Sequence, residues 1–379
     1  MAGKQKSKLT NAEIEAIYEA SDFQIGQERN DFFLPQIVDY VRRNKWINLR
    51  PEYQRRLVWD HGKKSRLIES FLLNVPIPAV FLYEWDLNRY EVMDGQQRLN
   101  SVLEFYSDGF ALSSLDKWEV LNGFKYSELP ERIRKGLDRR RVTATVLQVG
   151  MGADTKERQE LRRLVFERLN TGGQSLNAQE LRNCLYQGEL NTLTMELASN
   201  SNFTRMWGIP NHKYPLPKDD IPKPLAENRF FKRMLDCEIV LRFFAFGVPP
   251  SQIKGSVRSM LDRCMERHQE MTPADVRLYK RRFASRVKLA LDIFGVDAFR
   301  LPNVNEELER YSPPLWDGIM VALDRQFDQA TRLRSRKTRI AKALRSKLTD
   351  RDFLDVVVGK PNTAEAIRAR ISAIEHLLA

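Results

Sequence analysis

Apolar and polar residues follow two different periods along this chain. Between about residues 31 and 190 both periods occur, which predicts a mixed α/β region. Apolar positions three or four residues apart predict helices over 34–43, 63–74 and 96–106. Alternating or β-branched runs predict strands over 80–85, 89–93 and 141–149, and a hairpin turn joins the first two.

Helical spacing dominates the remainder of the chain. The predicted helices cover 156–169, 177–186, 229–246, 256–267, 273–294, 314–327 and 363–378. We therefore expect an α+β protein with three parts: a flexible leader over 1–30, an α/β domain over 31–190 and a helical domain over 191–379. The leader carries one short helix over 11–20, for which Asn11 is the expected cap.

Composition excludes several classes of protein. A chain of 379 residues has room for two domains, and 42% hydrophobic residues with 10% aromatics excludes a mostly disordered protein. No run approaches the roughly 20 apolar residues that span a bilayer. The three cysteines, Cys184, Cys237 and Cys264, are far apart and odd in number, which argues against a disulfide framework or a zinc site. We expect a protein of the reducing cytoplasm.

Charge points to an anionic partner. The formal net charge is +12, which favours nucleic acid or nucleotide phosphates. The excess is uneven, because residues 331–349 hold eight basic side chains and no acidic one. This stretch is either a solvated basic helix or a surface that follows phosphates, and charge alone does not decide between the two.

The strongest candidate site is the turn Asp94-Gly95-Gln96-Gln97-Arg98, between a predicted strand and a predicted helix. Such a turn directs main-chain N–H groups outward at the positive end of the helix dipole, where a phosphate binds well. Gly95 permits close approach, and the Arg98 guanidinium could bind phosphate oxygens in pairs. Asp94 could hold Mg²⁺ or position a water. An ordinary turn with a helix cap is the alternative.

Two further segments are weaker candidates. Gln54 and Arg55 lie on an extended segment beside Trp59, where they could contact phosphates while an aromatic ring stacks on a base. Arg168, Asn170 and Thr171 could face the phosphate site across a cleft. The simpler interpretations are an exposed edge strand for the first segment and a glycine helix cap for the second.

Several catalytic signatures are absent from the sequence. The four histidines, His61, His212, His268 and His376, form no metal-binding or His-Asn-His cluster, and the chain has no Walker A run and no GxSxG motif. We therefore expect no nuclease centre of the ββα-metal type in this chain.

Four ordered motifs together resemble a known family. RPEYQRRLVW, RLIESFLLNVPIPAVFLYE, YEVMDGQQRLNSVLEFY and VFERLNTGGQSLNAQELRN, between residues 50 and 183, are similar to the N-terminal domain family of GmrSD restriction endonucleases. The resemblance implies a ParB N-terminal/sulfiredoxin-like fold and a nucleoside-triphosphate site on the DGQQR turn. Larger members add a His-Asn-His-type nuclease domain, whereas this chain ends in predicted helices, so a separate nuclease subunit is implied.

The resemblance also implies roles for individual residues. Asp94 and Gln97 would be catalytic, Asp94 would hold Mg²⁺, and Gln54, Arg55, Gly95, Gln96, Arg98, Arg168, Asn170 and Thr171 would bind the nucleotide. The protein would then be a nucleotide-binding, NTP-hydrolysing control component of an anti-phage restriction system with DNA as a partner. The type of NTP and the oligomeric state stay open.

Two rival functions stay open at this stage. One is a ParB-like DNA-binding module in which nucleotide acts only as a switch. The other is a metal-dependent nuclease that uses Asp94 with Glu91 or Glu69, although Glu91 and Asp94 are three residues apart near a strand end and need not share a face.

Overall fold

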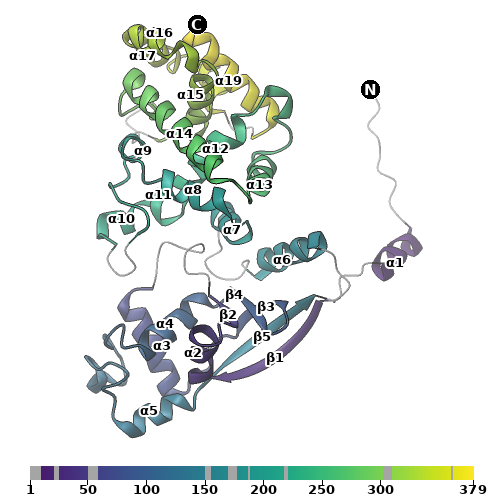
Figure 1. Ribbon diagram of the computed structural model, residues 1–379, viewed down its shortest axis with the longest axis vertical. Coiled ribbons are helices and arrows are strands. Elements are labelled where there is room, and N and C mark those ends of the chain that lie inside the picture. The colour runs from purple at the N-terminus through teal and green to yellow at the C-terminus, as the bar shows by residue number, and fades with distance from the viewer. Residues whose placement is uncertain are drawn as a thin grey trace. The chain divides into compact units, whose positions relative to one another are not determined.

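The computed structural model divides the chain into two compact units (Figure 1). Unit 1 comprises Met1–Arg50 and Val58–Ser175, and unit 2 comprises Pro51–Leu57 and Leu176–Ala379. The structure describes residues 10–20, 25–49, 59–149, 155–169, 177–186, 188–216, 221–301, 310–359 and 362–379. Along the chain, this division falls between Ser175 and Leu176, whereas we expected a domain boundary at residue 190. The expected α+β class, an α/β N-terminal part with a helical C-terminal half, is confirmed.

Unit 1 is built on a five-stranded mixed sheet of order β1-β5-β3-β4-β2. The strands are β1 (Ile25–Phe33), β2 (Ile47–Asn48), β3 (Val80–Asp86), β4 (Arg89–Asp94) and β5 (Arg141–Val149). β3 pairs antiparallel with β4 and parallel with β5, while β1 pairs antiparallel with β5 along its whole length. The hairpin between β3 and β4 therefore lies at the centre of the sheet.

The first edge strand corrects the expected leader. Residues 25–30 belong to β1 and pair in register with β5, from Ile25 opposite Val149 to Phe33 opposite Arg141. Its sequence, IGQERNDFF, is polar for five consecutive positions, Gln27 to Asp31, which an edge strand exposed to water permits. The helix over 11–20 forms as predicted, but Thr10 rather than Asn11 caps it, because the Thr10 hydroxyl accepts from the Glu13 N–H at 3.3 Å.

Helices cover both faces of the sheet. The helices of unit 1 are α1 (Asn11–Ala20), α2 (Leu34–Arg42), α3 (His61–Leu73), α4 (Gln96–Tyr106), α5 (Glu131–Asp138) and α6 (Thr155–Leu169). Figure 1 shows α2, α3 and α4 on one side of the sheet and α6 on the other. Apolar residues of α2, α3 and α4 pack on alternate strand residues such as Val80, Leu82 and Val92. One hydrophobic core therefore lies between these helices and the sheet.

The regular elements among the described residues of unit 2 are all helices. Its helices are α7 (Ala178–Leu185), α8 (Glu189–Leu197), α9 (Ser201–Met206), α10 (Lys223–Glu227), α11 (Arg229–Lys232), α12 (Leu235–Phe246), α13 (Val257–Arg267), α14 (Pro273–Phe294), α15 (Pro313–Arg325), α16 (Ala330–Ser335), α17 (Lys337–Lys347), α18 (Arg351–Val358) and α19 (Ala364–Leu378). The predicted helix over 229–246 is two helices, because Met234 adopts a left-handed conformation with φ of 52°.

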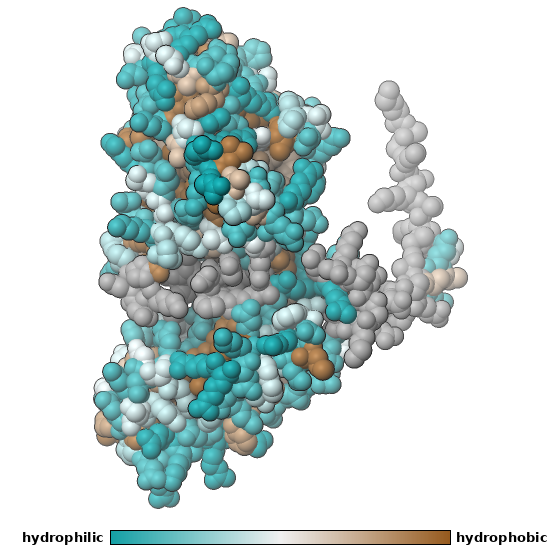
Figure 2. All heavy atoms as spheres, viewed as in Figure 1, coloured by the Kyte–Doolittle hydropathy of each residue, from teal (hydrophilic) through white to brown (hydrophobic). Residues whose placement is uncertain are grey.

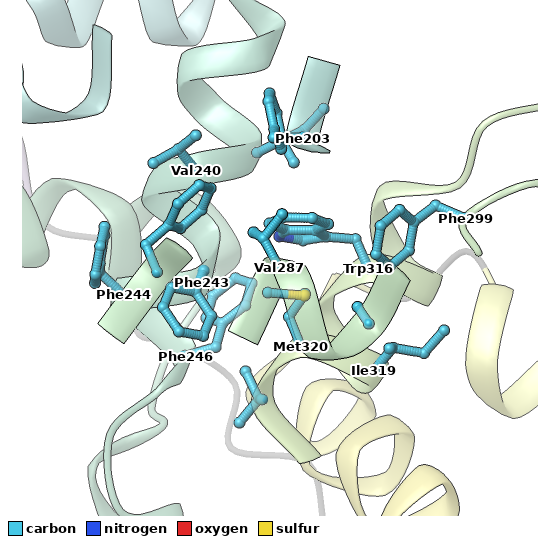
Figure 3. Packing of buried hydrophobic residues seen from close by; sticks show 14 of the residues in the cluster. Phe203, Val240, Phe243, Phe244, Phe246, Val287, Phe299, Trp316, Ile319 and Met320 are labelled. Atoms are coloured by element: carbon cyan, nitrogen blue, oxygen red, sulfur yellow. The ribbon is translucent and has the colours of Figure 1, made fainter. Parts of the chain in front are cut away.

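The core of unit 2 is rich in aromatic rings (Figure 3). Trp316 on α15 lies edge-on to Phe203 and Phe299, with ring centroids 5.4 and 4.8 Å apart. Phe243 of α12 packs in the same way against Phe283 of α14. Such edge-to-face pairs add about 0.5–1.5 kcal/mol each beyond the area they bury, so they stabilise unit 2 in addition to the burial of its apolar surface.

Most residues on the face of the molecule drawn in Figure 2 are hydrophilic, and apolar residues there form small separate areas. Among the described helices, none combines the length and the apolar character that crossing a membrane requires.

Candidate nucleotide site

The predicted turn joins the end of β4 to the start of α4. Gly95 caps α4 with φ of 92° and ψ of 9°, and its carbonyl accepts the first helical hydrogen bond, from the Leu99 N–H at 3.0 Å. A Cβ atom at this position would lie 2.5 Å from Cγ1 of Val80. Both the backbone angle and this contact require glycine. The turn therefore has the strand–glycine–helix geometry that the sequence predicted.

Arg98 does not point into open solvent. Its side chain is 15% exposed, and its Nη2 donates to Oδ2 of Asp94 at 2.9 Å. Its Nη1 donates to the carbonyls of Pro78 and Ala79, which precede β3. Burial lowers the pKa of Arg98, and the Asp94 carboxylate opposes this shift. The guanidinium thus ties the segment before β3 to the β4–α4 turn.

This pairing changes how the predicted residues can act. We expected Arg98 to be available for phosphate oxygens and Asp94 for Mg²⁺, whereas here the two side chains bind each other. The Asp94 side chain is 50% exposed, so solvent and solutes reach it. Across the residues that the structure describes, no group of three or more His, Cys, Asp or Glu side chains is placed to hold a metal.

The two glutamines of the turn hold main-chain atoms that are distant in sequence. Nε2 of the buried Gln96 donates to the carbonyl of Leu49 at 2.6 Å. Oε1 of Gln97 accepts from the N–H of Trp59 at 3.1 Å. Leu49 and Trp59 flank residues 50–58, the segment that contains Gln54 and Arg55. Both flanks of that segment are therefore fixed to the first turn of α4.

Of the remaining predicted residues, the structure describes only Arg168. Gln54, Arg55, Asn170 and Thr171 lie outside the described residues. Arg168 is exposed in the last turn of α6. This helix packs against β4, where Nη2 of Arg162 donates to Oε1 of Glu91 at 2.7 Å.

The sequence named Glu91 as a candidate metal ligand but did not predict that it is buried and paired with Arg162. Glu91 on β4 is 2% exposed and lies directly opposite Tyr83 on β3, which is 4% exposed. Burial raises the pKa of Tyr83, and nearby Arg162 and Arg158 act in the opposite direction. The one sequence signal was a carboxylate between Tyr90 and Val92 in a predicted strand, because such a charge needs a cation when it is buried.

The carboxylates of the nuclease alternative have separate partners. Asp94 pairs with Arg98, and Glu91 pairs with Arg162. Glu69 on α3 accepts hydrogen bonds from the main-chain N–H groups of Asp116, Lys117 and Trp118. Burial works to raise the pKa of Glu69, but these three hydrogen bonds outweigh it and lower the pKa below the usual value. These carboxylates do not assemble a shared metal site.

Comparison with known proteins identifies the region around this turn. Residues 34–187 match the family model described as "GmrSD restriction endonuclease, N-terminal domain". The match includes the β4–α4 turn, α6 and α7. No curated protein and no solved structure matches the chain.

Proposed function

Residues 34–187 of this chain are a GmrSD restriction endonuclease N-terminal domain, and from that premise we propose that the protein is a nucleotide-binding control component of a DNA restriction system. In this role it hydrolyses a nucleoside triphosphate and acts with a separate nuclease. The nucleotide binds at the β4–α4 turn.

One observation carries the choice of this turn. Consecutive glutamines on α4 hold both flanks of residues 50–58, through Leu49 and Trp59. Two of the motifs that characterise this region of the chain therefore meet at the first turn of one helix. A helix N-terminus next to a glycine is a favourable place for phosphate, and Gln54 and Arg55 belong to the attached segment.

The Arg98–Asp94 pair defines how the site would work. Nη1 of Arg98 holds the carbonyls of Pro78 and Ala79 and so keeps the guanidinium oriented, while Nη2 exchanges Asp94 for a phosphate oxygen. Asp94 is then released to orient Mg²⁺ or the attacking water. A single carboxylate suits Mg²⁺, which commonly uses one or two protein carboxylates together with substrate phosphates. Gln97, three residues after Asp94 in the first turn of α4, positions the water.

A panel of nucleoside triphosphates with Mg²⁺ tests this proposal by thermal unfolding. A ligand at 100 times its dissociation constant stabilises the folded state by about 2.7 kcal/mol. We expect one or more triphosphates to raise the melting temperature of the wild type. The proposal fails if no triphosphate does so.

Asp94→Asn separates binding from catalysis. The side chain is half exposed, so this variant should keep the fold. We expect it to bind nucleotide without Mg²⁺ at least as well as the wild type, because Arg98 loses a competing anion. Hydrolysis, measured as phosphate release, should be lost. Unaltered hydrolysis would remove Asp94 from the mechanism.

Phosphate release also distinguishes hydrolysis from switching. Turnover that increases with DNA supports the control component proposed here. Measurable nucleotide binding with no turnover, in the presence or absence of DNA, would favour the ParB-like switch instead.

A further inference from the structure

Helices α14, α16 and α17 of unit 2 carry a concentration of exposed cations. α14 packs against both α16 and α17. We define the basic face as the exposed arginines and lysines of these helices that have no acidic partner among the described residues: Arg277, Arg281, Lys288, Arg332, Lys337, Arg339, Lys342 and Arg345. Uncompensated cations on packed helices create a fixed field of positive potential.

The acidic residues nearby do not neutralise this face. Asp324 on α15 accepts from both Arg282 and Arg286 of α14, so one carboxylate serves two cations. Asp292 at the end of α14 pairs with Arg334 of α16 at 2.9 Å. The Asp292–Arg334 pair also joins the two helices.

The cations of α14 follow one side of the helix. Arg277 and Arg281 are four residues apart, and Lys288 follows Arg281 by seven residues. The three side chains therefore project in similar directions. The side therefore leads from Arg277 to the contact with Arg334 on α16. α14 has 22 residues and is about 33 Å long, close to the 34 Å of one turn of duplex DNA.

A surface hollow of about 390 Å³ lies along the same helix. Its lining is Leu278, Tyr279, Arg281, Arg282, Ser285 and Arg286. The Arg286 guanidinium is stacked 3.6 Å above the ring of Phe327, which holds it in place. Arg281 belongs to the basic face, and Arg282 and Arg286 share the single carboxylate of Asp324, so the three guanidinium groups keep an excess of positive charge that suits a phosphate group.

The apolar residues of these helices exclude a lipid surface as the preferred partner. Ile340 and Leu344 of α17 are buried in the core of unit 2. Leu278 is the one exposed large hydrophobic residue within the described parts of α14, α16 and α17. An amphipathic helix that binds a membrane needs an exposed apolar side, which is missing here.

We propose that the basic face binds the sugar–phosphate backbone of duplex DNA. Arginine and lysine contacts to phosphate give affinity without reading sequence, so this surface would hold the DNA while other groups read it. The choice of DNA over RNA rests on the proposed function of the protein. The location of the surface rests on the exposed cations of α14, α16 and α17 and is independent of the proposed function.

The test compares two triple variants with equal changes in charge. Arg339→Glu, Lys342→Glu and Arg345→Glu together reverse three cations of the basic face. Lys213→Glu, Lys232→Glu and Lys254→Glu together reverse three exposed lysines elsewhere in unit 2. Binding to a fluorescent duplex of unmodified DNA is measured by anisotropy at several salt concentrations. Thermal unfolding checks that both variants fold.

We expect the basic-face variant to lose on the order of tenfold or more in affinity. The slope of log K against log salt should fall by about 2.7, because each lost phosphate contact contributes about 0.9. The control variant should change both quantities much less. Equal losses in the two variants would overturn the proposal, since they would show only a net-charge effect.

Two other ligands and one further readout complete the experiment. Tighter binding of duplex RNA, or binding of phosphatidylserine vesicles in place of DNA, would also overturn the proposal. Nucleotide stabilisation is measured on the same proteins, and the basic-face variant should retain it. Absence of nucleotide binding in every protein, with the DNA results as expected, would contradict the nucleotide site alone.

Discussion

At the scale of single residues, Gly95 matters both to the candidate site and to the stability of unit 1, because there is no room for a Cβ atom at this position. Its φ of 92° and the 2.5 Å approach of a Cβ to Val80 both oppose any side chain. Gly123 offers a matched comparison, because its φ is 90° and no atom lies within 4 Å of a Cβ built there.

Gly95→Ala should therefore destabilise the protein more than Gly123→Ala. We expect about 1 kcal/mol from backbone strain in both variants and a further 1–3 kcal/mol from overpacking in Gly95→Ala alone. The midpoint of urea unfolding measures the difference. Equal midpoints for the two variants would show that β3 moves away from the turn at little cost.

In unit 2, Asp317 forms buried ion pairs with two arginines, Arg242 and Arg370. Its Oδ1 accepts from Nε of Arg242 at 2.9 Å, and its Oδ2 accepts from Nη1 of Arg370 at 3.3 Å. Asp317 and Arg370 are fully buried. Removing one partner of such a group leaves an uncompensated charge in a medium of low dielectric constant.

Asp317→Asn should destabilise unit 2 by about 3–5 kcal/mol, since the buried Arg370 then lacks its acidic partner and Arg242 keeps, among the described residues, only Glu238, at 3.6 Å. Asp328→Asn serves as the control, because Asp328 is exposed and should change stability by less than about 0.5 kcal/mol. Denaturant unfolding of both variants measures the effect. A small loss for Asp317→Asn would mean that water enters and hydrates the arginines.

At the scale of elements, Glu69 shows how one side chain connects a helix to a loop. The carboxylate on α3 accepts from three consecutive main-chain N–H groups, those of Asp116, Lys117 and Trp118. The pKa of Glu69 is lowered in the folded protein, since these hydrogen bonds outweigh the opposing effect of burial. The stabilisation depends on the ionised form.

Stability should therefore depend on pH through Glu69. A group with a lowered pKa stabilises the fold above its unfolded value, about 4.5, and this contribution is lost as the pH falls through the folded value. Glu69→Gln should cost about 1–3 kcal/mol at pH 7. Urea midpoints between pH 7 and pH 3 should converge for variant and wild type. A difference that persists at low pH would show that packing, not charge, is lost.

Sequence patterns predicted elements well where one face of the element is buried. The bounds 96–106, 141–149 and 273–294 coincide with α4, β5 and α14. Strand β1 was missed because an edge strand needs no apolar alternation. The break at Met234 was missed because the apolar spacing continues through it, and a left-handed residue other than glycine leaves little trace in the sequence.

For the candidate site, local sequence predicted the backbone of the turn but not its tertiary contacts. The glycine turn at Asp94–Arg98 followed from local sequence, because φ, helix start and strand end are local properties. The contacts of Arg98 with the carbonyls of Pro78 and Ala79 depend on the packing of β3 beside β4, which no local pattern specifies. The attachment of Leu49 and Trp59 to Gln96 and Gln97 is tertiary for the same reason.

At the scale of the whole molecule, each unit has a separate hydrophobic core. The core of unit 1 lies between the sheet and α2, α3 and α4, and the core of unit 2 contains the aromatic cluster around Trp316. Domains with their own cores commonly unfold as independent cooperative units. Calorimetry of the intact chain should therefore resolve two transitions.

The residue variants assign those transitions. Gly95→Ala should lower the melting temperature of one transition and Asp317→Asn that of the other, because each substitution affects one core. A triphosphate should raise the transition that Gly95→Ala lowers, since the proposed nucleotide site lies in unit 1. Duplex DNA should raise the transition that Asp317→Asn lowers, since the basic face lies in unit 2. If both ligands shifted both transitions equally, the two units would be coupled energetically, and nucleotide binding would then have a direct route to alter the affinity for DNA.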